Sequence, residues 1–181
     1  TVRVKDVQND CLLLACAMHR GTISGAPEGF EKVAETVNAV GTNQYVTIWK
    51  KVVSGGEKCA VTVTQASSVR MSLKAIVLYN AADVTVAENL LLEKIPHTPP
   101  PLSGKRRLYF WDSVYASNDG VFNSCQVSDC EGLDLKEAAE QRFSVYYDYQ
   151  PELEILPSFT YSLADWHENT AHFITLDIEE D

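Results

Sequence analysis

Large apolar and polar side chains alternate in two similar stretches of the chain. Residues 44–52 read Gln-Tyr-Val-Thr-Ile-Trp-Lys-Lys-Val, and residues 141–149 read Gln-Arg-Phe-Ser-Val-Tyr-Tyr-Asp-Tyr. A period of two residues is typical of a β-strand that buries one face. Both stretches are therefore predicted to be strands, and their similarity indicates an internal repeat.

The elements around these two strands recur in the same order. A continuous apolar run at residues 11–20 predicts a central strand buried on both faces, and residues 107–115 take the place of residues 12–20 in the second copy. The sequence Glu131-Gly-Leu echoes Glu28-Gly-Phe. After the alternating strand, each copy has a turn that ends in glutamate, a short alternating run and a closing strand. These are residues 54–57, 60–64 and 70–78 in the first copy, and 151–154, 158–162 and 170–178 in the second.

Four further segments have weaker patterns. Residues 1–8 alternate loosely, which predicts an N-terminal strand, and a further strand is predicted to begin at Val84. Residues 30–40 have apolar side chains at helical spacing but also fit a strand, and the β-rich context favours the strand. Residues 133–141 contain good helix formers, consistent with one or two helical turns.

The predicted fold class is all-β. Strands do not alternate with helices, so a parallel sheet is not expected, and many short strands between turn residues favour an antiparallel architecture. The sequence predicts a duplicated antiparallel β-sandwich, jelly-roll-like, with two pseudo-repeats. The repeats are residues 1–94 and 105–181, joined by a proline-rich connection at 95–104, because prolines stiffen an extended segment and cannot donate to a sheet.

Composition and charge narrow the classes of partner. The chain is 45% hydrophobic, enough for a core, and no segment approaches the roughly 18 apolar residues that span a bilayer. It begins at Thr1 with no visible signal peptide.

Residues 1–95 carry ten Lys or Arg against nine Asp or Glu, whereas residues 96–181 carry five against sixteen. Such an acidic half repels phosphate backbones, so neither nucleic acid nor membrane is an expected partner. Its acidity is interpreted as a solubilising surface, with a basic protein partner as the alternative.

The cysteine pattern is that of a protein assembled in a reducing compartment. Cys11, Cys16 and Cys59 lie in strand-like runs, where a thiol behaves as a small buried hydrophobe. Cys125 and Cys130 lie in a polar stretch that is predicted to be a loop. A disulfide between them remains open, whereas a zinc site lacks a second cysteine pair or suitably spaced histidines.

No pattern for catalysis is present. The chain has no nucleophile elbow, phosphate loop, zinc-protease helix or dinucleotide fingerprint. Its scattered histidines include His19 and His172 in strand-like runs, which are interpreted as hydrogen-bonded structural residues. The chain is predicted not to be an enzyme, with no catalytic, cofactor-binding or metal-binding residues and no cofactor.

One loop has the composition of a ligand contact. Its candidate residues are Asp165, Trp166, His167 and Glu168. An indole face can stack on a sugar while carboxylate and imidazole groups bind its hydroxyls, so a carbohydrate would suit this loop. The alternative is that Trp166 only closes the open end of the sandwich. The other large aromatic side chains considered, Trp49, Tyr109 and Trp111, lie within strands and are predicted to be core.

A set of short motifs resembles a β-sandwich repeat of tailed-phage virion proteins and of phage fibres or adhesins. In the first half these motifs are residues 12–17, the turn Pro27-Glu-Gly-Phe30, Ile48-Trp-Lys-Lys51, Gly56-Glu57 and the Val-Thr-Val-Thr strand. In the second half they are Pro99-Pro-Pro101, Leu108-Tyr-Phe-Trp111, Phe143-Ser-Val-Tyr-Tyr147 and Ser162-Leu-Ala-Asp-Trp166. The chain departs from the family where Phe30 replaces a tryptophan and where no proline precedes Gly132.

The resemblance implies a structural role in a virion. The expected function is that of a capsid decoration or cement protein on the particle exterior, which binds the major capsid protein or other virion proteins. It would be a homo-oligomer or a capsid-bound multimer, located in the virion and assembled in the host cytoplasm. The alternative is a fibre or adhesin module that binds host-surface carbohydrate.

Overall fold

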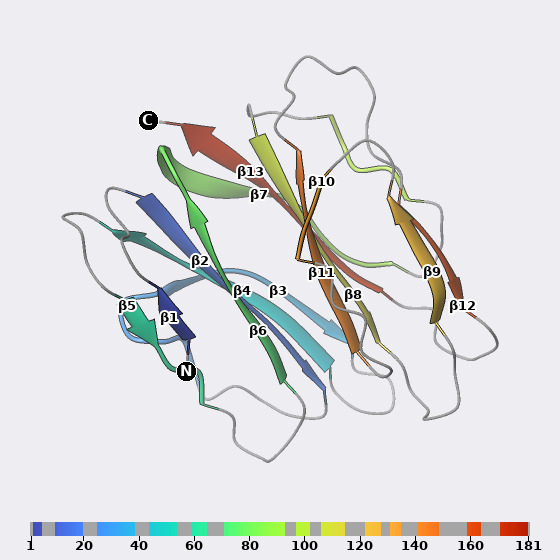
Figure 1. Ribbon diagram of the computed structural model, residues 1–181, viewed down its shortest axis with the longest axis horizontal. Coiled ribbons are helices and arrows are strands. Elements are labelled where there is room, and N and C mark those ends of the chain that lie inside the picture. Colours follow the sequence, from blue (N-terminus) through green and yellow to red (C-terminus); the bar gives the residue numbers. More distant parts are fainter. Residues whose placement is uncertain are drawn as a thin grey trace. The chain divides into compact units, whose positions relative to one another are not determined.

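The regular elements of this chain are β-strands (Figure 1). A computed structural model describes residues 2–4, 10–19, 25–38, 44–53, 59–64, 71–92, 97–101, 106–114, 122–127, 131–134, 141–148, 159–163 and 171–180. Among these residues there is no helix, and hence none long and apolar enough to cross a membrane. The all-β prediction is confirmed.

The chain forms two compact units. Unit 1 consists of Thr1–Thr85 with Ile178–Asp181, and unit 2 consists of Val86–Asp177. The repeat boundaries at residues 94 and 105 stay a prediction, because a division into compact units does not test whether the two halves are copies.

A four-stranded antiparallel sheet forms the body of unit 1, with the strand order β3-β4-β2-β6 (Figure 1). Its strands are β2 (Asp10–His19), β3 (Glu31–Asn38), β4 (Gln44–Val53) and β6 (Met71–Leu78). A two-stranded sheet joins β1 (Val2–Val4) to β5 (Cys59–Val61). The side chains of residues 11–17 in β2 are all buried, so the prediction of a central strand buried on both faces is confirmed.

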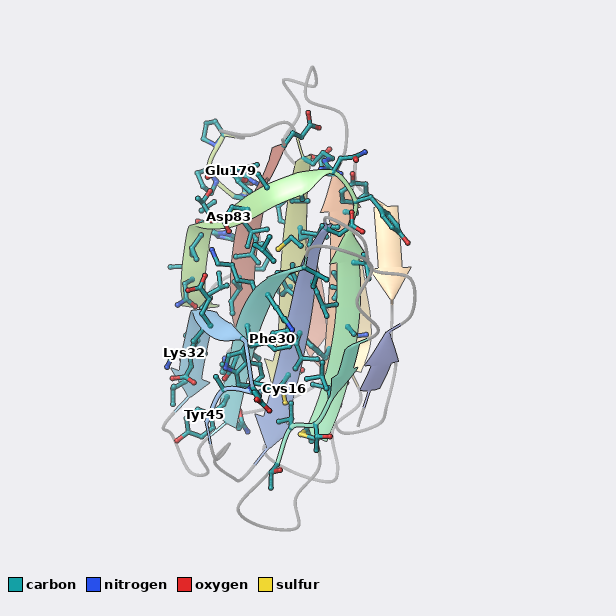
Figure 2. The ribbon with its side chains drawn as sticks, turned by 90° about the vertical axis from the view of Figure 1, so that its left-hand side faces the viewer. Cys16, Phe30, Lys32, Tyr45, Asp83 and Glu179 are labelled. Carbon is teal, nitrogen blue, oxygen red and sulfur yellow. The ribbon has the colours of Figure 1, made fainter. Side chains whose placement is uncertain are left out.

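One face of this sheet carries a compact apolar core. Because side chains alternate along a strand, Leu14 and Cys16 of β2 share a face with Trp49 of β4. They pack with Val61 and Val63 from the β5 segment, so unit 1 has two β layers. Phe30 packs on the same cluster, and Figure 2 shows its ring close to Cys16.

A tight turn positions Phe30 on this core. The Phe30 amide donates a hydrogen bond to the carbonyl oxygen of Pro27 at 3.0 Å, and Gly29 has φ +77°. Glycine adopts this left-handed backbone without steric cost at the third position of a type II turn. The Pro-Glu-Gly-Phe motif therefore encodes a turn that delivers an aromatic ring to the core.

Unit 2 is built on a five-stranded sheet with the order β10-β11-β8-β13-β7 (Figure 1). Its strands are β7 (Ala81–Leu92, which begins in unit 1), β8 (Arg106–Val114), β10 (Glu131–Asp134), β11 (Gln141–Asp148) and β13 (Ala171–Glu180, which ends in unit 1). A two-stranded antiparallel sheet pairs β9 (Phe122–Val127) with β12 (Phe159–Leu163).

Aromatic side chains fill the core of unit 2 on both faces of β8. Tyr109 and Trp111 share one face and contact Phe173 of β13, with ring centroids 6.3 and 5.8 Å apart. Phe110 points to the opposite face and stacks on Phe143 of β11 at 6.3 Å. The predictions that Trp49, Tyr109 and Trp111 are core residues are confirmed, since each is at most 2% exposed.

The two main sheets share strand order and register. The order β3-β4-β2-β6 in unit 1 corresponds to β10-β11-β8-β13 in unit 2. Leu12 pairs with Lys51 in unit 1, and Arg107 pairs with Asp148 in unit 2. The predicted repeat aligns Arg107 with Leu12 and Asp148 with Lys51, so the two strand pairs have the same register. A register shift interrupts β3 between Lys32 and Ala34, and another interrupts β10 between Gly132 and Asp134. A shared bulge is a specific feature, so it supports the predicted duplication.

The register changes one detail of the repeat. Glu131 pairs with Tyr147 of β11 as Glu31 pairs with Lys50 of β4. The structural counterpart of Glu131 is therefore Glu31, and the predicted echo of Glu28 was wrong. The sequence comparison aligned the two Glu-Gly pairs because they are identical. Strand pairing instead aligns Glu131 with Glu31, because each precedes the bulge of its strand.

One local prediction was wrong, one is tested only in part and one ambiguity is resolved. Residues 31–38 form β3, as the β-rich context favoured. Leu133 and Asp134 belong to β10 and Gln141 belongs to β11, whereas residues 135–140 lie outside the described residues, so a helical turn there stays a prediction. Cys125 lies in β9 rather than in a loop, while Cys130 lies outside the described residues.

Candidate functional site

The predicted ligand loop cannot be placed from the structure. Asp165, Trp166, His167 and Glu168 lie between β12 and β13, outside the described residues. A carbohydrate contact at this loop therefore stays a prediction. The chemistry that the structure does position is a set of ionisable side chains inside each unit.

The most extensive polar cluster surrounds Arg107 at the start of β8. Its guanidinium forms a bidentate ion pair with Asp177 of β13, through Nε to Oδ1 and through Nη2 to Oδ2 at 3.0 Å. Nη1 also donates to the carbonyl oxygen of Pro100 at 2.6 Å, and Nη2 to that of Pro101 at 3.2 Å. Both charged side chains are almost completely buried.

This arrangement fixes the charges rather than making them reactive. Burial lowers the pKa of Arg107, but the hydrogen bonds and the charge of Asp177 outweigh that effect and leave the pKa raised. Arg107 thus stays charged over the ordinary pH range. Its four hydrogen bonds tie the proline-rich segment to β8 and β13, so this cluster is a structural clamp.

A histidine anchors the other end of the proline-rich segment. His97 Nε2 lies 3.1 Å from Glu88 Oε2 of β7, and the two side chains are 17% and 16% exposed. The ring also contacts Phe173 edge-on at a centroid distance of 4.9 Å, and Pro99 is buried. The segment 97–101 is therefore packed within unit 2. Its predicted role as a connection between two copies stays a prediction.

In unit 1, a lysine is held between two carboxylates. Lys50 of β4 forms ion pairs with Asp83 of β7 and, at 3.2 Å, with Glu31 on the neighbouring strand. Burial lowers the pKa of Lys50, but hydrogen bonds to both carboxylates raise it more. The Asp83 carboxylate also accepts the Val84 amide at 2.7 Å, and the pKa of Asp83 is lowered although burial acts against this.

Cys11 lies beside this charged group but is not a reactive thiol. The side chain is fully buried, and its pKa is raised to about 11 by burial and by the negative charge of Asp83. Because the thiolate is the reactive form of cysteine, this thiol is protected from oxidation and alkylation. Cys16 is buried as well. The prediction that these two cysteines serve as buried hydrophobes is confirmed.

His172 of β13 was interpreted as a hydrogen-bonded structural residue, and only part of that interpretation holds. The side chain is 1% exposed, but neither ring nitrogen has a hydrogen-bond partner among the described residues. Burial lowers its pKa to about 4. A neutral imidazole enclosed in this way is a source of acid sensitivity.

The sequence held a signal for the Arg107 cluster that the alternation pattern did not reveal. In the repeat, Arg107 stands where Leu12 stands, and Asp177 stands where Val77 stands; Leu12 and Val77 are cross-strand partners in unit 1. An apolar pair in one copy is thus replaced by opposite charges in the other. Aligning the copies would have identified this pair.

Metal binding was considered for the described residues only. Within the residues that the structure describes, no group of three or more His, Cys, Asp or Glu side chains is placed to hold a metal ion. Comparisons with known protein families, with curated proteins and with solved structures find no match for this chain.

Proposed function

We propose that this chain is a structural protein of a tailed-phage particle that acts without catalysis, as a decoration protein bound to the outside of the capsid. The proposal combines the motif resemblance with the way the chain uses its polar groups. In this role the protein binds the major capsid protein or another virion protein, in many copies per particle, and is assembled in the host cytoplasm.

The observation that carries the proposal is the internal use of charge. Arg107, Lys50 and His97 each bind a carboxylate of their own unit, and these contacts join strands or fix the proline-rich segment. Groups that are held in this way stiffen a module and do not supply an acid, a base or a nucleophile to a substrate. A rigid β module with an acidic second half suits a protein that coats a particle.

The motifs of the resemblance support a role of the same kind. Leu12, Trp49 and Trp111 are core residues, and residues 27–30 form the turn that seats Phe30. The described motif residues thus contribute to the fold. They support membership of a class of virion modules without favouring carbohydrate over a protein partner.

The test is the number of copies of this chain in purified virions, measured by quantitative mass spectrometry against the major capsid protein. Copies in the hundreds are expected for a decoration protein. A few to a few dozen would instead indicate a tail or fibre component, and binding of glycans before and after Trp166→Ala would then test the adhesin alternative. Absence of the chain from purified particles would overturn the virion role altogether.

A further inference from the structure

Two strands pass from one unit to the other, and β13 does so close to its end. β7 leaves unit 1 after Thr85, and β13 re-enters unit 1 at Ile178. Figure 1 shows the two strands as neighbours in one sheet. Residues 81–85 of β7 and residues 178–180 of β13 are therefore both parts of unit 1, whereas residues 171–177 belong to unit 2.

The part of β13 that belongs to unit 2 is firmly held. Its last residue is Asp177, whose carboxylate forms the bidentate ion pair with Arg107. Further back along the strand, Phe173 contacts two aromatic rings of β8. All side chains of residues 172–177 are at most 2% exposed. The strand is thus fixed up to the residue at which it leaves unit 2.

The end of β13, Ile178–Glu180, is held by less side-chain contact. Ile178 is 1% exposed, whereas Glu179 and Glu180 are exposed. Segments with few buried apolar contacts open at a lower free energy than the core of a protein does. The end of β13 is therefore expected to detach more readily than residues 172–177.

This end of β13 adjoins the segment of β7 that lies near Cys11. Asp83 of β7 forms an ion pair with Lys50 of β4, and its negative charge acts on the Cys11 thiol. Figure 2 shows Glu179 and Asp83, from the neighbouring strands β13 and β7, near one another. Within unit 1, the end of β13 thus borders the residues that surround Cys11.

We propose that Ile178–Glu180 form a latch on unit 1. When the latch detaches from β7, the end of the unit 1 sheet that contains Cys11 opens, while unit 2 stays folded. The Arg107–Asp177 ion pair is the fixed point at which this opening stops, because it holds β13 at the residue before the latch. The latch is a conformational device of the fold and does not depend on the proposed virion role.

Alkylation of the folded full chain tests the latch, because the Cys11 thiol is fully buried and its pKa is raised to about 11. In native buffer with excess iodoacetamide, peptide mass spectrometry measures separate modification rates for Cys11 and Cys16. Ile178→Ala should raise the rate at Cys11 by about tenfold or more, because it removes most of the buried apolar area of the latch. Cys16 of the same strand points to the opposite face, into the core around Trp49, and should keep its rate.

Glu179→Ala is the matched control, since it changes the next residue of the latch at an exposed position. It should leave the rate at Cys11 within about twofold of the wild type, because an exposed side chain contributes little to stability. If Cys11 and Cys16 accelerate equally in Ile178→Ala, unit 1 has lost stability as a whole and the latch is refuted. An unchanged rate at Cys11 would also refute it, since the strand end would then fray without opening the sheet.

Hydrogen exchange of the unmodified chain gives a second readout that does not depend on whether a variant folds. The amides of residues 178–180 should exchange faster than those of residues 173–177, which the ion pair and the aromatic contacts hold. Equal protection along the whole of β13 would overturn the proposal, because the strand would then open as one piece. Neither readout depends on whether the chain belongs to a virion.

Discussion

At the scale of single residues, His172 has the clearest physical consequence. The imidazole is buried on β13, and burial lowers its pKa to about 4 from an ordinary value of 6.5. The unfolded chain therefore binds a proton at a higher pH than the folded chain does. Stability from the neutral ring is complete above pH 6.5 and is lost as the pH falls towards 4, by about 3 kcal/mol in total.

We predict that His172→Leu removes this acid sensitivity. Between about pH 7.5 and pH 4.5, the wild type should lose about 2–3 kcal/mol more unfolding free energy than the variant, as measured by urea denaturation. Carboxylates also titrate in this pH range, among them Asp112, which is buried on the neighbouring strand β8. Their contribution is common to the wild type and the variant, so it cancels when the pH-dependent losses of the two proteins are subtracted. An imidazole resonance that titrates near its ordinary pKa in the folded protein would contradict the prediction.

At the scale of elements, the Arg107–Asp177 pair joins β8, β13 and the proline-rich segment. Removing one member of a buried ion pair leaves the other charge without compensation, at a cost of about 3–5 kcal/mol. We predict a loss of this size for Arg107→Leu and for Asp177→Val. The double variant recreates the Leu12 and Val77 pair of unit 1 and should be more stable than either single variant.

A double-mutant cycle in urea tests this prediction. The interaction energy should be favourable by about 2 kcal/mol or more, because the double variant leaves no buried charge. Arg107→Leu and the double variant both remove the hydrogen-bond donors of the Pro100 and Pro101 carbonyl groups. The free-energy cost of losing these hydrogen bonds therefore cancels when the two variants are compared. Losses that simply add would show that the ion pair does not couple the two strands.

The sequence predicted most elements, and its errors have physical causes. Alternation identified β4, β8 and β11, and the continuous apolar run identified β2, because burial imposes those patterns directly. The same reasoning treats a charge as a sign of exposure, so it could not predict that Arg107 is 0% exposed. The proline-rich connection at 95–104 stays a prediction, and alternation could not reveal that His97 contacts Glu88 or that Arg107 binds the Pro100 carbonyl, because these contacts depend on single side chains. The candidate ligand loop remains a prediction from composition alone.

At the scale of the whole molecule, the two main sheets are similar in geometry while the two halves of the sequence differ in charge. The two main sheets agree in strand order, register and bulge, yet residues 1–95 have a formal charge of +1 and residues 96–181 one of −11. Strand pairing depends on backbone groups and buried side chains, so exposed positions can change sign without altering the sheet.

The same imbalance predicts how stability responds to salt. Excess carboxylates repel one another in the folded chain, and ions screen exposed charges more strongly than buried pairs such as Arg107–Asp177. Raising NaCl from about 20 mM to about 200 mM should therefore increase the thermal midpoint by about 2–4 °C, equivalent to roughly 1 kcal/mol. KCl at equal ionic strength should have the same effect, because screening does not depend on the identity of the cation. A midpoint that falls with salt would mean that exposed ion pairs, rather than repulsion among carboxylates, dominate the electrostatics of the fold.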